Sequence, residues 1–159
     1  MSKYVLCRMN YKQGGAAMNM MQLVIFRLNE QEYAIDIFKV NEIVPYRTPT
    51  KIPNSPDYIE GVLNLRDNVI PVINLKKRFN LENEDTNEDA RIIVTNLEGK
   101  MAGFVVDEAS NVVTVESEKI EPVTEVVSNI GRKYINGIGK KDDGSMYILL
   151  NFDELNKEG

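Results

Sequence analysis

Carboxylates are the side chains of this chain that could do chemistry, and they gather in two polar segments. Asp85, Glu88 and Asp89 lie in one acidic stretch, and Asp142 and Asp143 lie in another. Carboxylates held at a fixed separation can bind a divalent cation or act as acid and base. Neither stretch has the ligand series of a calcium-binding loop, and both have the composition of turns. Solvated charge is therefore the favoured interpretation, and a carboxylate-based metal-binding protein or enzyme is the alternative.

Other kinds of chemistry lack their usual residues. The 159-residue chain has no histidine and one cysteine, which excludes an internal disulfide and a zinc site built from the usual nitrogen and sulfur ligands of one chain. It has no glycine-rich phosphate-binding motif. Its formal charge of −5 disfavours nucleic acid and anionic membranes as partners. We expect no catalytic residue and no cofactor, and a reducing cytoplasm is the natural setting.

Arg66 and Glu42 are polar residues that lie next to apolar ones. Arg66 follows the run "GVLNL", and Glu42 lies beside Val40 and Ile43, whose spacing makes an apolar ridge. A carboxylate in such a setting is best stabilised by a cation, and arginine is its best bidentate partner. The pattern leaves open whether Glu42 and Arg66 meet, and a solvated turn residue is the alternative for Arg66.

The segment "GVLNLRDNVIPVINL" predicts the hairpin that would position Arg66. With Asp67-Asn68 as a two-residue loop, Arg66 lies opposite Val69, and Asp and Asn tolerate the positive φ that such a turn requires. Pro71 cannot donate to a strand ladder, so it is expected at an edge or bulge. Alternation turns one set of side chains toward the core: Leu63, Leu65, Ile70 and Val72.

The rest of the chain from Gln22 onward reads as short strands joined by polar turns. "QLVIFRL" and "EYAIDIF" flank "NEQ", "RIIVTNL" and "KMAGFVV" flank "EG", and "YINGIG" and "MYILLNF" flank "KKDDGS". Only "NLKKRF" and "FDELN" favour short helices, and the cluster Lys76-Lys77-Arg78 in the first of these is expected on an exposed helical face. The sequence predicts an all-β fold with short helical segments.

An internal repeat relates the two halves of the chain. "YIEGV", which begins at Tyr58, recurs as "YINGI", which begins at Tyr134. The first hairpin also recurs, at a different and smaller offset, which places Leu28 over Leu97, Ala34 over Gly103, Ile35 over Phe104 and Ile43 over Val112. Each unit is too small to be stable alone, so two small β-barrels that share a core or exchange strands are expected.

The first residues lack this patterning. Residues 1–21 are interpreted as an N-terminal extension that is either disordered or translated from a misassigned start, and residues 22–159 as the folded domain.

From Gln22 to about Leu155 the chain resembles the CheW family of bacterial chemotaxis coupling proteins. The resemblance lies in "EYAIDIFKVNEIV", "TKIPNSPDYIEGVLNLRDNVIPVINLKKRF", "ARIIV…GFVVDEASNVV" and "YINGIGKKDDGSMYILLNFDEL", which follow one another with family-like spacing. It implies two intertwined five-stranded SH3-like β-barrel subdomains. It also implies a non-catalytic adaptor, monomeric alone, that acts in the cytoplasm at the inner face of the membrane without inserting into it.

The partners implied by the resemblance are the regulatory domain of the histidine kinase CheA and the cytoplasmic tips of methyl-accepting chemoreceptors. The kinase-binding residues stay unassigned, and a related protein that serves another receptor–kinase array is an alternative. The implied receptor groove lies between the subdomains and is formed by Val40, Glu42, Ile43, Gly61, Asn64, Arg66, Val112 and Val113.

Four positions depart from the family pattern. Asp67 stands where glycine is usual, and Asn74 and Asn151 stand where aspartate is frequent. Glu60 stands where a basic residue is frequent, which is expected to alter partner preference.

Overall fold

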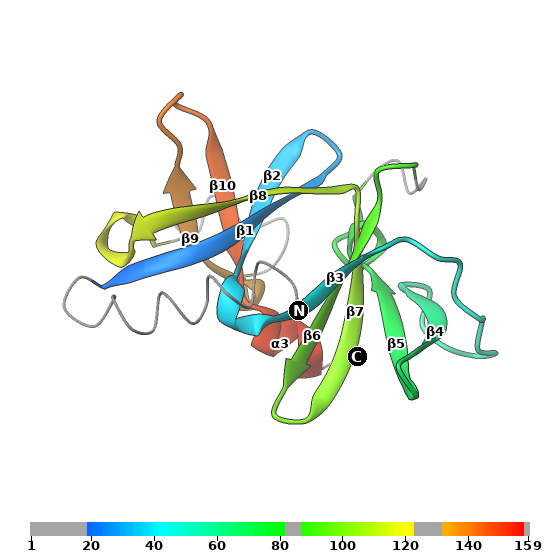
Figure 1. Ribbon diagram of the computed structural model, residues 1–159. Helices are drawn as coiled ribbons and strands as arrows, with labels where there is room; N and C mark the ends of the chain where they lie inside the picture. Colours follow the sequence, from blue (N-terminus) through cyan, green and yellow to red (C-terminus); the bar gives the residue numbers. More distant parts are fainter. Residues whose placement is uncertain (1–18, 82–86, 123–131, 158–159) are drawn as a thin grey trace.

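Ten strands in two five-stranded sheets make up most of the computed structural model, which describes residues 19–81, 87–122 and 132–157 (Figure 1). The strands are β1 (Met20–Leu28), β2 (Gln31–Asp36), β3 (Val40–Pro45), β4 (Ile59–Leu65), β5 (Asn68–Asn74), β6 (Arg91–Leu97), β7 (Lys100–Val106), β8 (Glu108–Glu116), β9 (Ile135–Lys140) and β10 (Met146–Leu150). The short helices are η1 (Ile37–Lys39), α2 (Leu75–Arg78), η2 (Ser117–Lys119), η4 (Arg132–Tyr134) and α3 (Phe152–Lys157). Within the described residues, no helix has the length and apolar character needed to cross a bilayer.

The two sheets exchange strands between the halves of the chain. The first sheet has the order β8-β1-β2-β10-β9, and the second has the order β3-β6-β7-β5-β4. Each sheet therefore combines a hairpin from one half with a hairpin and a single strand from the other, joined through one parallel pair, β10 with β2 or β5 with β7. The predicted fold of two intertwined five-stranded SH3-like β-barrels is confirmed.

The registers reproduce the internal repeat residue by residue. Ile43 lies opposite Ile93, and Val24 lies opposite Val112. The two pairs are equivalent, because Ile43 corresponds to Val112 and Val24 to Ile93 at one and the same offset in the sequence. An isolated antiparallel bridge also recurs near the open side of each sheet, between the chain segments at Thr50 and Val62 in one half and at Glu121 and Ile138 in the other. The duplication predicted from the sequence is thus visible in the pairing of the strands.

Three apolar clusters hold the structure together. One lies in each sheet, and the largest contains residues of both sheets and of α3. In this central cluster Phe152 of α3 packs edge-on against Phe26 of β1 and Phe104 of β7, with ring centroids 6.1 and 4.9 Å apart. Figure 1 shows α3 lying beside the place where the two sheets meet. Burial of these large side chains makes the two barrels one folding unit.

A buried ion pair adds a polar link to this apolar contact. Lys76 Nζ lies 2.8 Å from Asp107 Oδ1, and the two side chains are 5% and 9% exposed. Asp107 also accepts a hydrogen bond of 2.6 Å from the backbone N–H of Asn29, in the turn between β1 and β2. The prediction that Lys76 belongs to an exposed helical face is wrong, because α2 turns this residue toward the junction of β7 and β8.

Arg78 joins the two repeats in a similar way. Its guanidinium lies 5.0 Å from the ring centroid of Tyr58 and 4.9 Å from that of Tyr134, and it donates a hydrogen bond to the Tyr134 hydroxyl. The two tyrosines are the equivalent first residues of "YIEGV" and "YINGI". Arg78 is therefore held by cation–π contacts to both repeats and does not lie on a free helical face.

The hairpin formed by β4 and β5 differs from its predicted register. Leu65 pairs with Asn68 and Asn64 with Val69, so the two loop residues are Arg66 and Asp67, both with positive φ (50° and 70°). The same apolar side chains still face the core, since the pairing shifts by one residue on each strand and alternation is preserved.

Two boundaries complete the comparison with the sequence. Pro71 lies opposite Val62 in the β4–β5 ladder, and pairing of β5 with β7 begins only at Val72. β5 is therefore not an edge strand, but its β7 side is unpaired at the proline, as a residue without an N–H donor requires. β1 begins at Met20, two residues before the predicted start at Gln22, because Met20 pairs with Glu116 of β8. The remainder of the predicted extension, residues 1–18, lies outside the described residues.

Replacing Tyr147 by phenylalanine is expected to raise the free energy of unfolding at pH 7 by about 1 kcal/mol. Tyr147 is 1% exposed, and its hydroxyl has no hydrogen-bond partner among the described residues. Burial raises the pKa of the Tyr147 hydroxyl in the folded state. As the pH rises past the ordinary tyrosine pKa, the unfolded chain therefore loses the hydroxyl proton before the folded chain does, and the free energy of unfolding falls. Urea unfolding at pH 7 and at alkaline pH tests both effects; a Tyr147→Phe variant less stable than the parent at pH 7 would contradict the first.

Candidate functional site

Arg66 and Glu42 meet in the structure. Arg66 Nη1 lies 2.9 Å from Glu42 Oε1, and the two side chains are 75% and 13% exposed. Glu42 lies on β3 and Arg66 follows β4, which are the two edge strands of the second sheet. The ion pair therefore spans the open side of the barrel, on the side where Thr50 and Val62 exchange two backbone hydrogen bonds of 2.9 Å.

Stability alone does not explain this arrangement of Arg66. An ion pair with one partner as exposed as Arg66 contributes about 0–1 kcal/mol to folding. A left-handed backbone at a residue other than glycine costs about 1–2 kcal/mol, and Arg66 has φ 50°. The pair therefore contributes little to stability, and it presents a guanidinium to solvent beside a largely buried carboxylate.

The other groove residues implied by the resemblance fall into two sets. Ile43 and Val112 are half-buried and pack against the central cluster from opposite sheets, and Asn64 is exposed on β4. These three, with Arg66 and Glu42, have surface that a partner could reach. Val113 is half-buried as well and packs against the apolar cluster of the first sheet. Two residues are placed differently: Val40 is 2% exposed, and Gly61 is buried.

Gly61 has a packing role that accounts for its residue type. Its φ is 144°, and a Cβ atom at this position would lie 2.1 Å from the carbonyl oxygen of Thr50. Only a residue without a side chain allows the segment around Thr50 to approach β4 this closely. Gly61 therefore shapes the site by closing the barrel.

The carboxylate segments show turn chemistry. Asp143 Oδ1 accepts hydrogen bonds from the backbone N–H and the hydroxyl of Ser145, at 2.9 and 2.6 Å, and these bonds hold the pKa of Asp143 below its usual value. In the described part of the chain, no three or more acidic, histidine or cysteine side chains are grouped so as to hold a metal ion. Asp85 lies outside the described residues.

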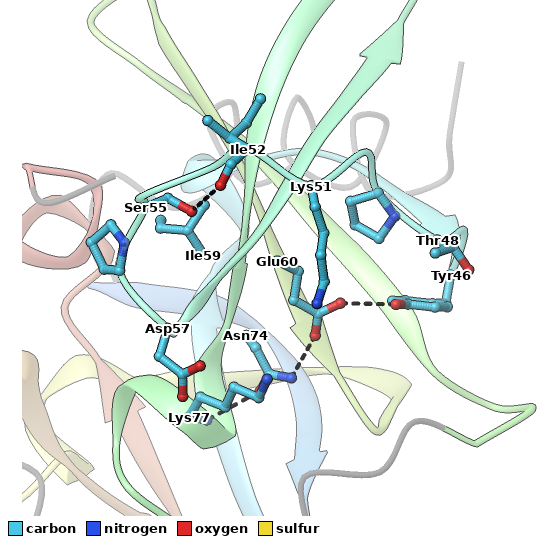
Figure 2. Close-up of a pocket in the computed structure, with 12 residues that line it drawn as sticks. Tyr46, Thr48, Lys51, Ile52, Ser55, Asp57, Ile59, Glu60, Asn74 and Lys77 are labelled. Carbon is cyan, nitrogen blue, oxygen red and sulfur yellow. Dashed lines mark hydrogen bonds between the residues drawn. The ribbon is translucent and has the colours of Figure 1, made fainter.

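A polar pocket that the sequence did not predict lies in the second barrel (Figure 2). Glu60 Oε1 accepts a hydrogen bond of 2.8 Å from the Tyr46 hydroxyl, and Glu60 Oε2 accepts one of 2.5 Å from Asn74 Nδ2. Glu60 and Asn74, two of the four positions expected to depart from the family pattern, are therefore contact partners. Asn74 lies in the predicted hairpin and Glu60 directly before it, but the predicted register does not bring them together. Glu60 lies at an irregularity of the β4–β5 pairing, between Ile59 and Gly61, that the sequence did not indicate.

The comparisons with known proteins agree with this architecture. Residues 22–158 match the CheW-like domain family. The chain is 37% identical over 134 residues to the chemotaxis protein CheW of Klebsiella aerogenes, covering 84% of this chain and 80% of that protein. It is 36% identical over 137 residues to the chemotaxis protein CheW of Bacillus subtilis, covering 86% and 88%.

A solved structure supports the same assignment. The crystal structure of the scaffolding protein TtCheW from Thermoanaerobacter tengcongensis superimposes with a TM-score of 0.77 at 40% identity, covering 82% of this chain and 84% of that one. Fold, strand exchange and sequence similarity agree over the described residues. The chain therefore belongs to the CheW family of chemotaxis scaffold proteins.

Proposed function

We propose that the chain is a non-catalytic adaptor that couples chemoreceptors to the histidine kinase CheA. In this role it binds the cytoplasmic tip of a receptor with one surface and the regulatory domain of the kinase with another. The observation that carries the receptor contact is the Arg66–Glu42 pair, which combines an exposed guanidinium with a fixed carboxylate at the open side of a barrel.

Apolar residues beside this pair and at the equivalent position of the other barrel suit a helical partner. Ile43 and Val112 occupy equivalent positions in the two repeats and contribute half-buried apolar surface from both barrels. A helix presents apolar ridges with polar groups between them, and it docks on apolar ground that offers a few polar anchors. Contacts of this kind are modest in area and exchange quickly, so a dissociation constant on the order of micromolar is expected.

Arg66→Ala and Glu42→Ala are each expected to weaken receptor binding about tenfold or more, which corresponds to about 1.4 kcal/mol or more. The reason is that either change removes a charged anchor or the group that orients it. The measurement is receptor-dependent activity of the kinase in reconstituted complexes, together with urea unfolding of each variant. Arg27→Ala is a matched control, since Arg27 forms a comparable exposed ion pair with Glu108 (2.7 Å) in the first barrel.

A charge exchange separates two roles of the pair. The double variant Glu42→Arg/Arg66→Glu can keep an ion pair, so it restores binding only if the pair acts by shaping the barrel. Continued loss of binding in the exchange variant indicates that the receptor contacts Arg66 or Glu42 directly. Full receptor control of the kinase by Arg66→Ala would remove Arg66 from the receptor site.

For the kinase contact we propose the exposed N-terminal ends of β5 and β10. Val69 is 69% exposed and Met146 is 52% exposed. The two residues occupy equivalent positions in the repeats. Val69 lies three residues before Val72, which pairs with Gly103, and Met146 lies three residues before Leu149, which pairs with Ala34, the equivalent of Gly103. Val69→Asp is expected to weaken binding of the kinase regulatory domain by about 1–3 kcal/mol if Val69 is a central contact, measured by calorimetry with Met146→Asp beside it. Unchanged affinity in both variants would exclude these ends.

A further inference from the structure

The pocket next to Glu60 has a volume of about 730 Å³ and lies between the segment that follows β3 and the strands β4 and β5 with α2. Figure 2 shows its side chains converging from these elements, with Glu60 between Tyr46 and Asn74. Part of the lining is apolar and includes Ile52, which is 45% exposed, and Ile59. None of the eight groove residues lines this pocket, so it is separate from the surface proposed for the receptor.

The Glu60 carboxylate is fixed in place by neighbours that are themselves fixed. Asn74 is 2% exposed, its Oδ1 accepts a hydrogen bond of 3.1 Å from the backbone N–H of Lys77, and its own N–H donates to the carbonyl oxygen of Tyr58 at 2.8 Å. Asn74 Nδ2 is thus held facing Glu60, and the Tyr46 hydroxyl holds the second carboxylate oxygen. The carboxylate is oriented before any partner arrives.

The charge of Glu60 is not neutralised by these contacts, since both donors are neutral groups. Glu60 forms no ion pair with any residue that the structure describes. A carboxylate has about four acceptor positions, of which Tyr46 and Asn74 use two, so about one on each oxygen remains available. A guanidinium group is the side chain best suited to donate to both oxygens of one carboxylate.

Lys51 and Lys77 also line the pocket, but they do not make it a site for an anion. Asp57 and Glu60 line it with them, so the formal charges of the lining balance. The lysines have long flexible side chains that can move to solvent, whereas Glu60 is held by two hydrogen bonds and cannot turn away. When a cation binds, the two lysine ammonium groups can therefore move away from it, whereas a bound anion would lie next to the fixed Glu60 carboxylate.

We propose that this pocket binds an arginine side chain of a partner protein, with the guanidinium on Glu60 and the aliphatic part against Ile52 and Ile59. Glu60 then decides the charge of the partner residue that this barrel accepts.

The test is a titration of the full-length ¹⁵N-labelled chain with N-acetyl-arginine amide, followed by NMR. The expected result is saturable shifts of the amide signals of Glu60, Asn74 and Lys77, with a dissociation constant on the order of millimolar. Two further compounds identify what is recognised. N-acetyl-citrulline amide has the same shape without the charge and should not bind, and methylguanidinium lacks the aliphatic part and should bind at least threefold more weakly.

Glu60→Gln is the central variant, because a glutamine can keep both hydrogen bonds: its oxygen accepts from Asn74, and its amide donates to the Tyr46 hydroxyl, which also accepts. The affinity of this variant for N-acetyl-arginine amide should fall at least tenfold. Glu118→Gln, which changes an exposed carboxylate of η2, is the control and should bind the compound with unchanged affinity. Equal binding by Glu60→Gln, or equal binding of the citrulline compound, would overturn the proposal. Equal affinity for methylguanidinium would also overturn it and leave only an adventitious cation.

Discussion

Replacing Lys76 by methionine is expected to lower the free energy of unfolding by about 3–5 kcal/mol. Lys76 and Asp107 are both almost fully buried and lie 2.8 Å apart. Removing the cation leaves Asp107 as a charge with little access to water, and hydrogen bonds alone do not offset the loss of hydration. Because Asp107 lies where the chain passes from β7 to β8, the loss should destabilise both barrels together. Urea unfolding followed by circular dichroism measures it.

Two further variants show whether the effect comes from the unpaired charge. Lys76→Met/Asp107→Asn removes both charges and keeps an oxygen that can accept the Asn29 N–H, so it should recover most of the lost stability. Lys77→Met changes the neighbouring, partly exposed lysine and should alter stability by less than about 0.5 kcal/mol. If Lys76→Met and Lys77→Met have the same unfolding free energy, the ion pair does not link the barrels as described.

Gly61→Ala is expected to cost about 3 kcal/mol or more of unfolding free energy. The added Cβ would lie 2.1 Å from the oxygen and 2.6 Å from the carbon of the Thr50 carbonyl group, and both are backbone atoms that cannot rotate away. The substitution should separate Thr50 from Val62 and open the barrel between β3 and β4, beside the Arg66–Glu42 pair. Receptor binding should then fall because the site is deformed.

Gly144→Ala is the matched control for this substitution. Gly144 also has a positive φ, 91°, but nothing lies within 4 Å of the position that its Cβ would occupy. Its replacement therefore introduces the backbone strain without the collision and should cost about 1 kcal/mol. Equal losses of stability at Gly61 and Gly144, measured by urea unfolding, would show that the close approach of Thr50 is unimportant.

A shared core or an exchange of strands was predictable because the chain repeats a small unit, and the repeat has two offsets. The first hairpins of the halves are related by the offset from Leu28 to Leu97, whereas the "Y-I-x-G" strands are related by the larger offset from Tyr58 to Tyr134. Units this small cannot bury enough apolar surface separately, so a shared core follows from size alone. The faces of β4 and β5 were also predictable, since alternation fixes them whichever residues form the turn.

The turn itself was not predictable from local preference. Asp67-Asn68 is the better pair for positive φ, yet the structure uses Arg66 and Asp67. The barrel closes with Arg66 beside Glu42, and a turn one residue later would place that side chain elsewhere. The contact itself was not readable from the sequence either, because it depends on how the two edge strands approach each other.

The burial of Lys76 escaped prediction for a related reason. A four-residue helix has too few positions for a periodic pattern to show which face is buried. The resemblance to the family implied eight groove residues, but two of them, Val40 and Gly61, are buried. Contacts with a partner are thus proposed for the six accessible residues.

The measurement that tests the adaptor function most directly is calorimetric titration of the full-length chain with the CheA regulatory domain of the same organism. A saturable one-to-one complex with a dissociation constant on the order of micromolar is the predicted result. Repeating the titration at a second temperature guards against a binding enthalpy near zero. Absence of binding at both temperatures, and in sedimentation at the same concentrations, would contradict the proposed coupling of receptors to this kinase.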